Sequence, residues 1–102
     1  MKIILDECVP GLVKKALPHH DIVTVQSQGW SGITNGKLLR LVAEEFDVFV
    51  TSDKNIKHQQ NLAEFDVALL VLPSNQVPAV EAVLGDIDDA LKRITRGELV
   101  EI

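Results

Sequence analysis

The sequence predicts an α/β fold, a three-layer α/β/α sandwich built on a mostly parallel sheet. Short apolar runs alternate with segments whose apolar residues recur at helical spacing, in the order β-α-β-α-β-α-β-α-β. The run at residues 66–72 (DVALLVL) is apolar enough to be buried on both faces, as inner parallel strands are. Such alternation implies parallel strands joined by right-handed crossovers, with helices covering the sheet.

The first third of the chain contains two of the expected strands. Residues 2–5 form a short apolar run, and residues 21–25 are rich in β-branched side chains. Between them, residues 10–17 show helical spacing, with a proline at the first position and another just after the last. Residues 26–34 hold two glycines and a tryptophan and are expected to form a loop.

Two further helices are expected in the middle of the chain. Asn35 can cap a helix over residues 37–45, whose apolar side chains fall on one side. Ser52 or Asp53 can cap a short third helix that runs to about Ala63.

The remaining segments complete the alternation. Residues 47–51 predict the third strand, and the run at 66–72 predicts the fourth. A helical pattern spans about residues 77–94, with Gly85 as the candidate break. Residues 99–102 predict a last strand, either an antiparallel edge or a tail that pairs with a partner, and a homodimer is left open.

Composition excludes several classes of protein. A chain of 102 residues predicts a single domain over 1–102, and its net charge of −5 argues against nucleic-acid binding through bulk positive charge. The lone cysteine, Cys8, forbids an internal disulfide and suits a reducing compartment. Because no apolar stretch approaches a membrane span or a signal peptide, we expect a cytoplasmic protein without a membrane partner.

Acidic side chains follow two of the predicted strands. Asp6 and Glu7 come directly after the first strand, and Asp53 lies two residues past Thr51, the end of the third. If these strands are neighbours, the acids meet at the carboxyl edge of the sheet, where α/β folds bind their ligands. Asn35 opens its helix from the same edge.

Crowded carboxylates repel one another and cost stability unless a cation lies between them. Mg²⁺ or Mn²⁺ is the natural candidate, because hard cations prefer oxygen ligands. Such an ion could activate water and stabilise the charge on a phosphodiester. The alternative interpretation is that Asp6 and Asp53 only cap helices and that Glu7 is solvated.

Other residues near the predicted edge allow more than one interpretation. Trp30 could stack a nucleic-acid base, although packing onto the domain as a lid is favoured. Lys54 is the best local positive charge for a phosphate group. The histidines at positions 19, 20 and 58 do not form a metal-binding spacing, and surface roles are expected for them.

Five motifs spread over most of the chain resemble one family. They are ILDECVP, QGWSGITNGKLL, FDVFVTSDKNI, QQNL and VLPSN, and their order and spacing fit throughout. With them the sequence resembles the PIN-like domain family of small bacterial proteins, relatives of the VapC-type ribonuclease toxins.

The resemblance implies a PIN-like fold and metal-dependent cleavage of single-stranded RNA, with a small antitoxin protein as partner. It makes Asp6, with Glu7 beside it, the first site acid, and Asp53 the acid of the TxD pattern. Asn35 and Asn55 stand where many relatives carry further acids. These two amides lower the charge available to hold metal, and Asn55 becomes a candidate for substrate binding beside Lys54 and Trp30.

Two other functions remain open. The domain could be a non-catalytic PIN-like module that binds RNA or a protein partner, because Asn35 and Asn55 replace acids. It could also be a receiver-like phosphoacceptor with Asp53 as the modified residue. That reading needs a lysine after the fifth strand, and no lysine follows it here.

Overall fold

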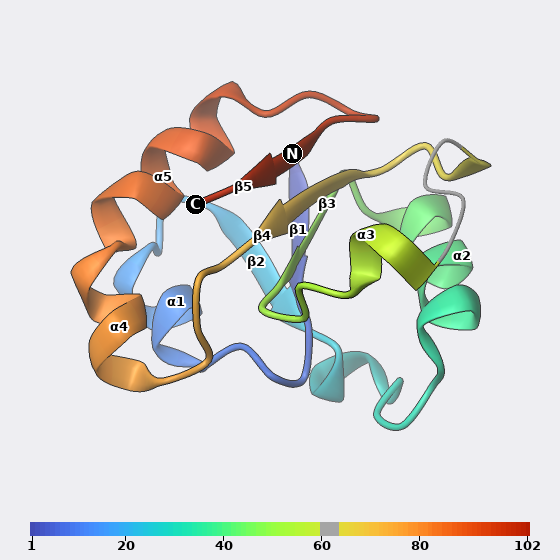
Figure 1. Cartoon of the computed structure of the whole chain (residues 1–102), viewed down its shortest axis with the longest axis horizontal. Coiled ribbons are helices and arrows are strands. Elements are labelled where there is room, and N and C mark those ends of the chain that lie inside the picture. Colours follow the sequence, from blue (N-terminus) through green and yellow to red (C-terminus); the bar gives the residue numbers. More distant parts are fainter. Residues whose placement is uncertain (60–63) are drawn as a thin grey trace.

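The strands of the computed structural model lie in the order β2-β1-β3-β4-β5, and every pairing is parallel (Figure 1). The structure describes residues 1–59 and 64–102. The strands are β1 (Lys2–Leu5), β2 (Asp21–Thr24), β3 (Val48–Thr51), β4 (Ala68–Val71) and β5 (Leu99–Glu101). The helices are α1 (Leu12–Ala16), α2 (Asn35–Glu45), α3 (Ile56–Gln59), α4 (Val77–Ala82) and α5 (Leu84–Arg93), with a 3₁₀ turn, η1, at Gln26–Gln28.

The parallel sheet is thus confirmed, but the antiparallel alternative for residues 99–102 is wrong. β5 runs parallel to β4, with Leu99 opposite Leu69. The reason is that α4 and α5 carry the chain back to the amino ends of the strands, so β5 enters the sheet in the same direction as β4.

Helices pack against both faces of the sheet. Successive strand residues point to opposite faces, so Ile3 and Leu5 join one apolar core while Ile4 joins the other. The first core receives side chains from α1, α4 and α5, and the second receives them from α2 and α3. Figure 1 shows these two groups of helices on opposite sides of the sheet. All four residues of β3 and of β4 are buried, which explains why these strands are almost wholly apolar in sequence.

Several helix boundaries differ from the sequence prediction. Helix α1 begins at Leu12, with Gly11 as its N-cap, and not at Pro10. Thr34, not Asn35, is the N-cap of α2, because Thr34 adopts the extended backbone of a cap and its carbonyl accepts from the N–H of Leu38. The break in the fourth helical segment falls at Val83, two residues before Gly85, where the N–H of Val83 bonds back to the carbonyl of Val80. The end expected for the third helix, near Ala63, lies outside the described residues.

Arg96 links several segments at the amino edge of the sheet, which is the edge at which the strands begin. Its guanidinium pairs with Asp47, before β3, and its Nε lies 3.3 Å from the carboxylate of Asp66, before β4. It also donates to the carbonyl of Phe46, which ends α2. The backbone N–H of Lys2 donates to Asp47 at 2.7 Å, and chiefly this bond, aided by Arg96, lowers the pKa of Asp47.

Candidate functional site

The carboxyl edge of the sheet, where the strands end, carries the predicted acids. β1 and β3 are neighbours, with Leu5 opposite Val50, as the sequence argument required. The N–H of Asp6 donates to the carbonyl of Val50 at 2.8 Å and so extends this pairing by one residue. Asp53 follows β3 by two residues. The two acids, 47 positions apart in the sequence numbering, therefore emerge from adjacent strands.

One buried hydroxyl group joins these two acids. Thr51 is fully buried, and its Oγ1 donates to Asp6 Oδ2 at 2.7 Å. The same oxygen accepts the backbone N–H of Asp53 at 3.1 Å. A buried hydroxyl needs such partners. In the sequence, Thr51 is the end of a predicted strand and the first residue of the TxD pattern. Neither feature indicates that its hydroxyl contacts both acids.

The carboxylate of Asp53 is held by two donors. Its Oδ2 accepts from the side-chain amide of Asn35 at 3.3 Å, and its Oδ1 accepts the backbone N–H of Asn55 at 3.0 Å. Asn35 reaches Asp53 because it is the first residue of α2 and does not cap that helix. The structure thus brings Asn35 and Asp53 together, while Asn55 contacts Asp53 through its backbone.

The side chain of Glu7 contacts the loop that follows β2. Glu7 is exposed and its Oε1 accepts the N–H of Gly32 at 2.6 Å. Gly32 has a φ of +80°, a conformation that side chains rarely adopt, so Glu7 fixes a turn that needs glycine. Over the described parts of the chain, Asp6, Glu7 and Asp53 do not form a group with ligand atoms all within 4.8 Å of one another.

The three predicted substrate-binding residues differ in their surroundings. The Trp30 ring packs edge-on against Phe46, with centroids 6.1 Å apart and planes at 86°. Phe46 belongs to the second apolar core, and Trp30 packs against that core, in agreement with the favoured interpretation that it packs onto the domain. Lys54 and Asn55 are exposed beside Asp53 at the carboxyl edge.

Cys8 is a neighbour of Asp6 that sequence reasoning did not place in the site. Its Sγ lies 3.6 Å from Asp6 Oδ2 and 3.7 Å from Thr51 Oγ1. The thiol is half-buried. Its position two residues after Asp6 was the only signal for this contact, and it gives no reason to assign the thiol a chemical role.

No family model, curated protein or solved structure matches this chain. Among the described helices, none has the length and apolar character needed to cross a membrane. A function must therefore be argued from the side chains themselves.

Ion pairing distinguishes the carboxyl edge from the amino edge of the sheet. No described Lys or Arg side chain forms an ion pair with Asp6 or Asp53. The described donors to these carboxylates are a hydroxyl, a thiol, an amide and backbone N–H groups, all uncharged. A carboxylate oxygen has two acceptor positions, and Asp6 Oδ1 and both Asp53 oxygens each accept from a single described donor.

A second group of polar side chains was missed entirely by the sequence argument. His19 and His20, in the turn between α1 and β2, both contact Asp88 of α5. The hydrogen bonds from His19, from His20 and from Lys92 hold the pKa of Asp88 well below its usual range. The paired histidines were visible in the sequence, but their acidic partner lies 68 residues away from His20.

Proposed function

We propose that this chain is a PIN-like, metal-dependent endoribonuclease that cleaves single-stranded RNA, with Asp6 and Asp53 as its metal ligands. One observation carries the proposal: two acids from distant stretches of chain are anchored to the same buried hydroxyl, Thr51, at the carboxyl edge of neighbouring parallel strands. Helices on both faces of the sheet are what a three-layer α/β/α fold of the PIN-like kind requires.

The residues present suit one hard divalent cation. Mg²⁺ usually binds through one or two protein carboxylates and keeps several waters, and Asp6 and Asp53 supply that number. Asn35, already bonded to Asp53, can add an amide oxygen. Mg²⁺ or Mn²⁺ held there would supply a Lewis acid for the phosphodiester and acidify a bound water. Glu7 is engaged with Gly32, so the donors favour one ion over two.

The chain's own residues hold the two carboxylates in fixed orientations. The Thr51 hydroxyl and the N–H of Glu7 each donate to one oxygen of Asp6. Asn35 and Asn55 do the same for Asp53. Donors that fix a ligand in advance strengthen metal binding, because little freedom remains to be lost. Lys54, exposed beside Asp53, offers a positive charge to the RNA phosphate backbone.

The negative net charge of the chain limits how such an enzyme would bind RNA. With a net charge of −5, the chain repels a polyanion at long range. RNA must then be bound at the edge itself, through the cation and Lys54. A small antitoxin protein, as the family resemblance implies, would be the inhibitor of this activity, and a gene beside this one that rescues cells from its toxicity would identify it.

The test is cleavage of single-stranded RNA in Mg²⁺ or Mn²⁺ by three proteins: wild type, the double variant Asp6→Asn with Asp53→Asn, and Asp47→Asn. Asp47 lies at the amino edge, so Asp47→Asn controls for the loss of an acid elsewhere. We expect cleavage by wild type and by Asp47→Asn only. Cleavage that survives in the double variant would refute the assignment.

A second function is favoured by two contacts at the same edge. Asn35 stands next to Asp53 where relatives of the resembled family carry an acid, and Glu7 is taken up by the loop at Gly32. With fewer acids at the edge, the domain would bind RNA or a partner protein without cleaving it. Binding of RNA in the absence of metal, with no heat of Mg²⁺ or Mn²⁺ uptake, would support this function.

A further inference from the structure

Two adjacent histidines and an aspartate converge on one point between the turn after α1 and helix α5. His19 Nε2 and His20 Nε2 lie 2.8 Å and 2.7 Å from the same oxygen, Asp88 Oδ1. The N–H of His20 donates to the carbonyl of Leu17, and the turn so closed sets the two rings 4.4 Å apart. In the described parts of the chain, these three side chains are the only group of His, Cys, Asp and Glu whose ligand atoms all lie within 4.8 Å.

We propose that His19, His20 and Asp88 bind a divalent transition metal, with Zn²⁺ as the expected ion. Imidazole nitrogen together with a carboxylate oxygen is a donor set that suits Zn²⁺. Three protein ligands leave a position on a tetrahedral ion open to water. The donor set differs from the oxygen-only edge around Asp6 and Asp53, so the two sites select different metals.

The surroundings of Asp88 support a ligand role. Its second oxygen, Oδ2, accepts from the Lys92 ammonium at 3.1 Å, which orients the carboxylate and leaves Oδ1 toward the histidines. Hydrogen bonds to the free oxygen of a ligating carboxylate are the usual outer support of a metal site. Helix α5 holds Asp88 rigidly, because the neighbouring Ile87 is buried in the core.

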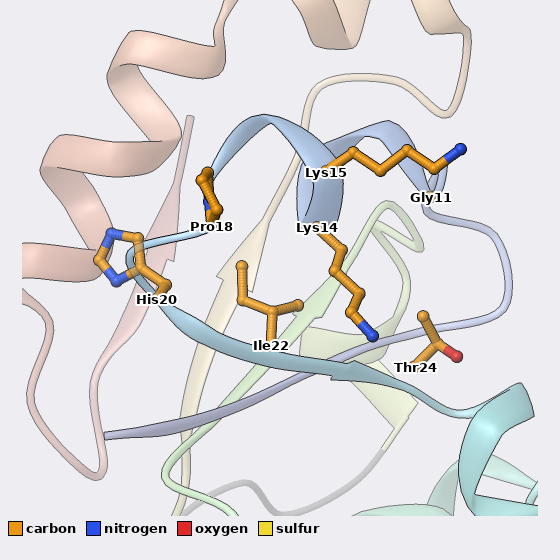
Figure 2. A pocket seen from close by; sticks show the side chains of 7 residues that line it. All are labelled: Gly11, Lys14, Lys15, Pro18, His20, Ile22 and Thr24. Carbon is orange, nitrogen blue, oxygen red and sulfur yellow. The ribbon is translucent and has the colours of Figure 1, made fainter.

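The site is also accessible. The side chain of His19 is 51% exposed, that of Asp88 is 21% exposed and that of His20 is 13% exposed. His20 also borders a pocket of about 540 Å³ between α1 and β2, and Figure 2 shows its ring at the end of that pocket nearest the helical layer containing α5. An ion can therefore enter from solvent without any rearrangement of the core.

A bound ion would tie the turn after α1 to α5, two segments 68 residues apart between His20 and Asp88. Anything that binds only the folded chain stabilises it. Thermal unfolding should then shift upward with Zn²⁺ in the wild-type protein and remain unchanged in a variant that lacks a ligand. A group that serves only as an ion pair would give no such shift.

The experiment uses the full chain without a polyhistidine tag, titrated with Co²⁺ as a visible probe and then with Zn²⁺ in competition. We expect saturation at one equivalent of Co²⁺, with the visible absorption spectrum of a Co²⁺ ion of low coordination number. Zn²⁺ should displace the Co²⁺. Asp88→Asn and His20→Gln should each weaken binding by at least about tenfold. His58→Gln, which changes an exposed histidine of α3, is the matched control and should bind as wild type does.

The double variant Asp6→Asn with Asp53→Asn separates this site from the proposed nuclease edge. It should retain Co²⁺ and Zn²⁺ binding, even where RNA cleavage is lost. Asp88→Asn keeps the size of this half-buried side chain, so circular dichroism should confirm the fold of the variant. The proposal is overturned if wild type shows no Co²⁺ spectrum, or if Asp88→Asn and His20→Gln bind as tightly as wild type.

Discussion

The two edges of the sheet each gather a pair of aspartates, but only the amino edge gives its pair a guanidinium. Asp47 and Asp66 precede neighbouring strands and both pair with Arg96. Asp6 and Asp53 follow neighbouring strands, and the described partners of their carboxylates are all uncharged. Among the described residues, the acids of the amino edge have a cationic partner and those of the carboxyl edge have none.

This difference is the basis of the proposed function, in which the paired acids serve the fold at one edge and a metal ion at the other. At the amino edge, the arginine pairs with both acids and also donates to the carbonyl that ends α2, so it links three segments of the fold. At the carboxyl edge, the donors orient the acids without neutralising them. Uncompensated charge costs stability, and a chain that keeps it there gains only if a cation binds.

The largest expected effect is on the rate of RNA cleavage, in which variants at the two edges should differ. Asp53→Asn should lower Mg²⁺-dependent RNA cleavage by about 100-fold or more, the scale seen when one preorganised electrostatic contact at a reacting centre is removed. Asp47→Asn should change the rate little, because Arg96 lies at the other edge. Single-turnover cleavage of a labelled RNA measures both. Equal losses in the two variants would mean that the edges do not differ in function.

The next effect concerns stability. Arg96→Met should lower the free energy of unfolding by about 1–2 kcal/mol, because it removes bonds to two carboxylates and to the end of α2 while leaving the acids unpaired. Arg93→Met, on the exposed surface of α5, is the matched control and should be close to neutral. Urea denaturation followed by circular dichroism measures the difference. An unchanged free energy of unfolding in Arg96→Met would contradict the structural role assigned to the amino edge.

Thr51 offers a smaller and more specific test of the carboxyl edge. Thr51→Val keeps the shape of this buried side chain but removes the donor to Asp6 and the acceptor for the N–H of Asp53. Mn²⁺ affinity should fall by about tenfold, as is common when the outer support of a metal ligand is lost. Thr51→Ser retains the hydroxyl and should restore most of the affinity. Isothermal titration calorimetry with Mn²⁺ compares the three proteins.

The smallest effect is a pH dependence assigned to the amino edge. The backbone N–H of Lys2, with the help of Arg96, lowers the pKa of Asp47 in the folded chain. The unfolded chain therefore binds more protons in acid, so the stabilising contribution is complete above the unfolded value near 3.8 and is lost as the pH falls below it. Asp47→Asn should flatten this part of the stability curve, whereas Asp89→Asn on α5 should leave it unchanged.

Local sequence patterns predicted much of the fold, because they reflect which face of each element is buried. The apolar runs that became β3 and β4 are buried throughout, so their pattern had one clear meaning. The direction of β5 could not be predicted, since residues 99–102 carry no signal for which strand they join. Thr34 and Asn35 are both good capping residues, so the sequence alone does not decide which of them caps α2. In the structure Thr34 has the extended backbone of the cap.

That Asp6 and Asp53 follow neighbouring strands was predictable, because a parallel sheet can place their strands side by side. Their shared contact with Thr51 was not predictable, because a β-branched residue at the end of a strand indicates only that the strand continues to that residue. Glu7 turns toward the loop at Gly32 for a reason that only the loop conformation reveals. The meeting of His19, His20 and Asp88 depends on how α5 packs, which no local pattern encodes.

The most direct test of the uncompensated carboxyl edge is a Mn²⁺ titration followed by electron paramagnetic resonance. All proteins should carry Asp88→Asn, so that the histidine group contributes no binding. The account predicts that this parent and its Asp47→Asn derivative remove one equivalent of Mn²⁺ from the free signal, and that the Asp53→Asn derivative removes none under the same conditions. Equal Mn²⁺ uptake by the Asp53→Asn derivative, or no uptake by the parent, would contradict it.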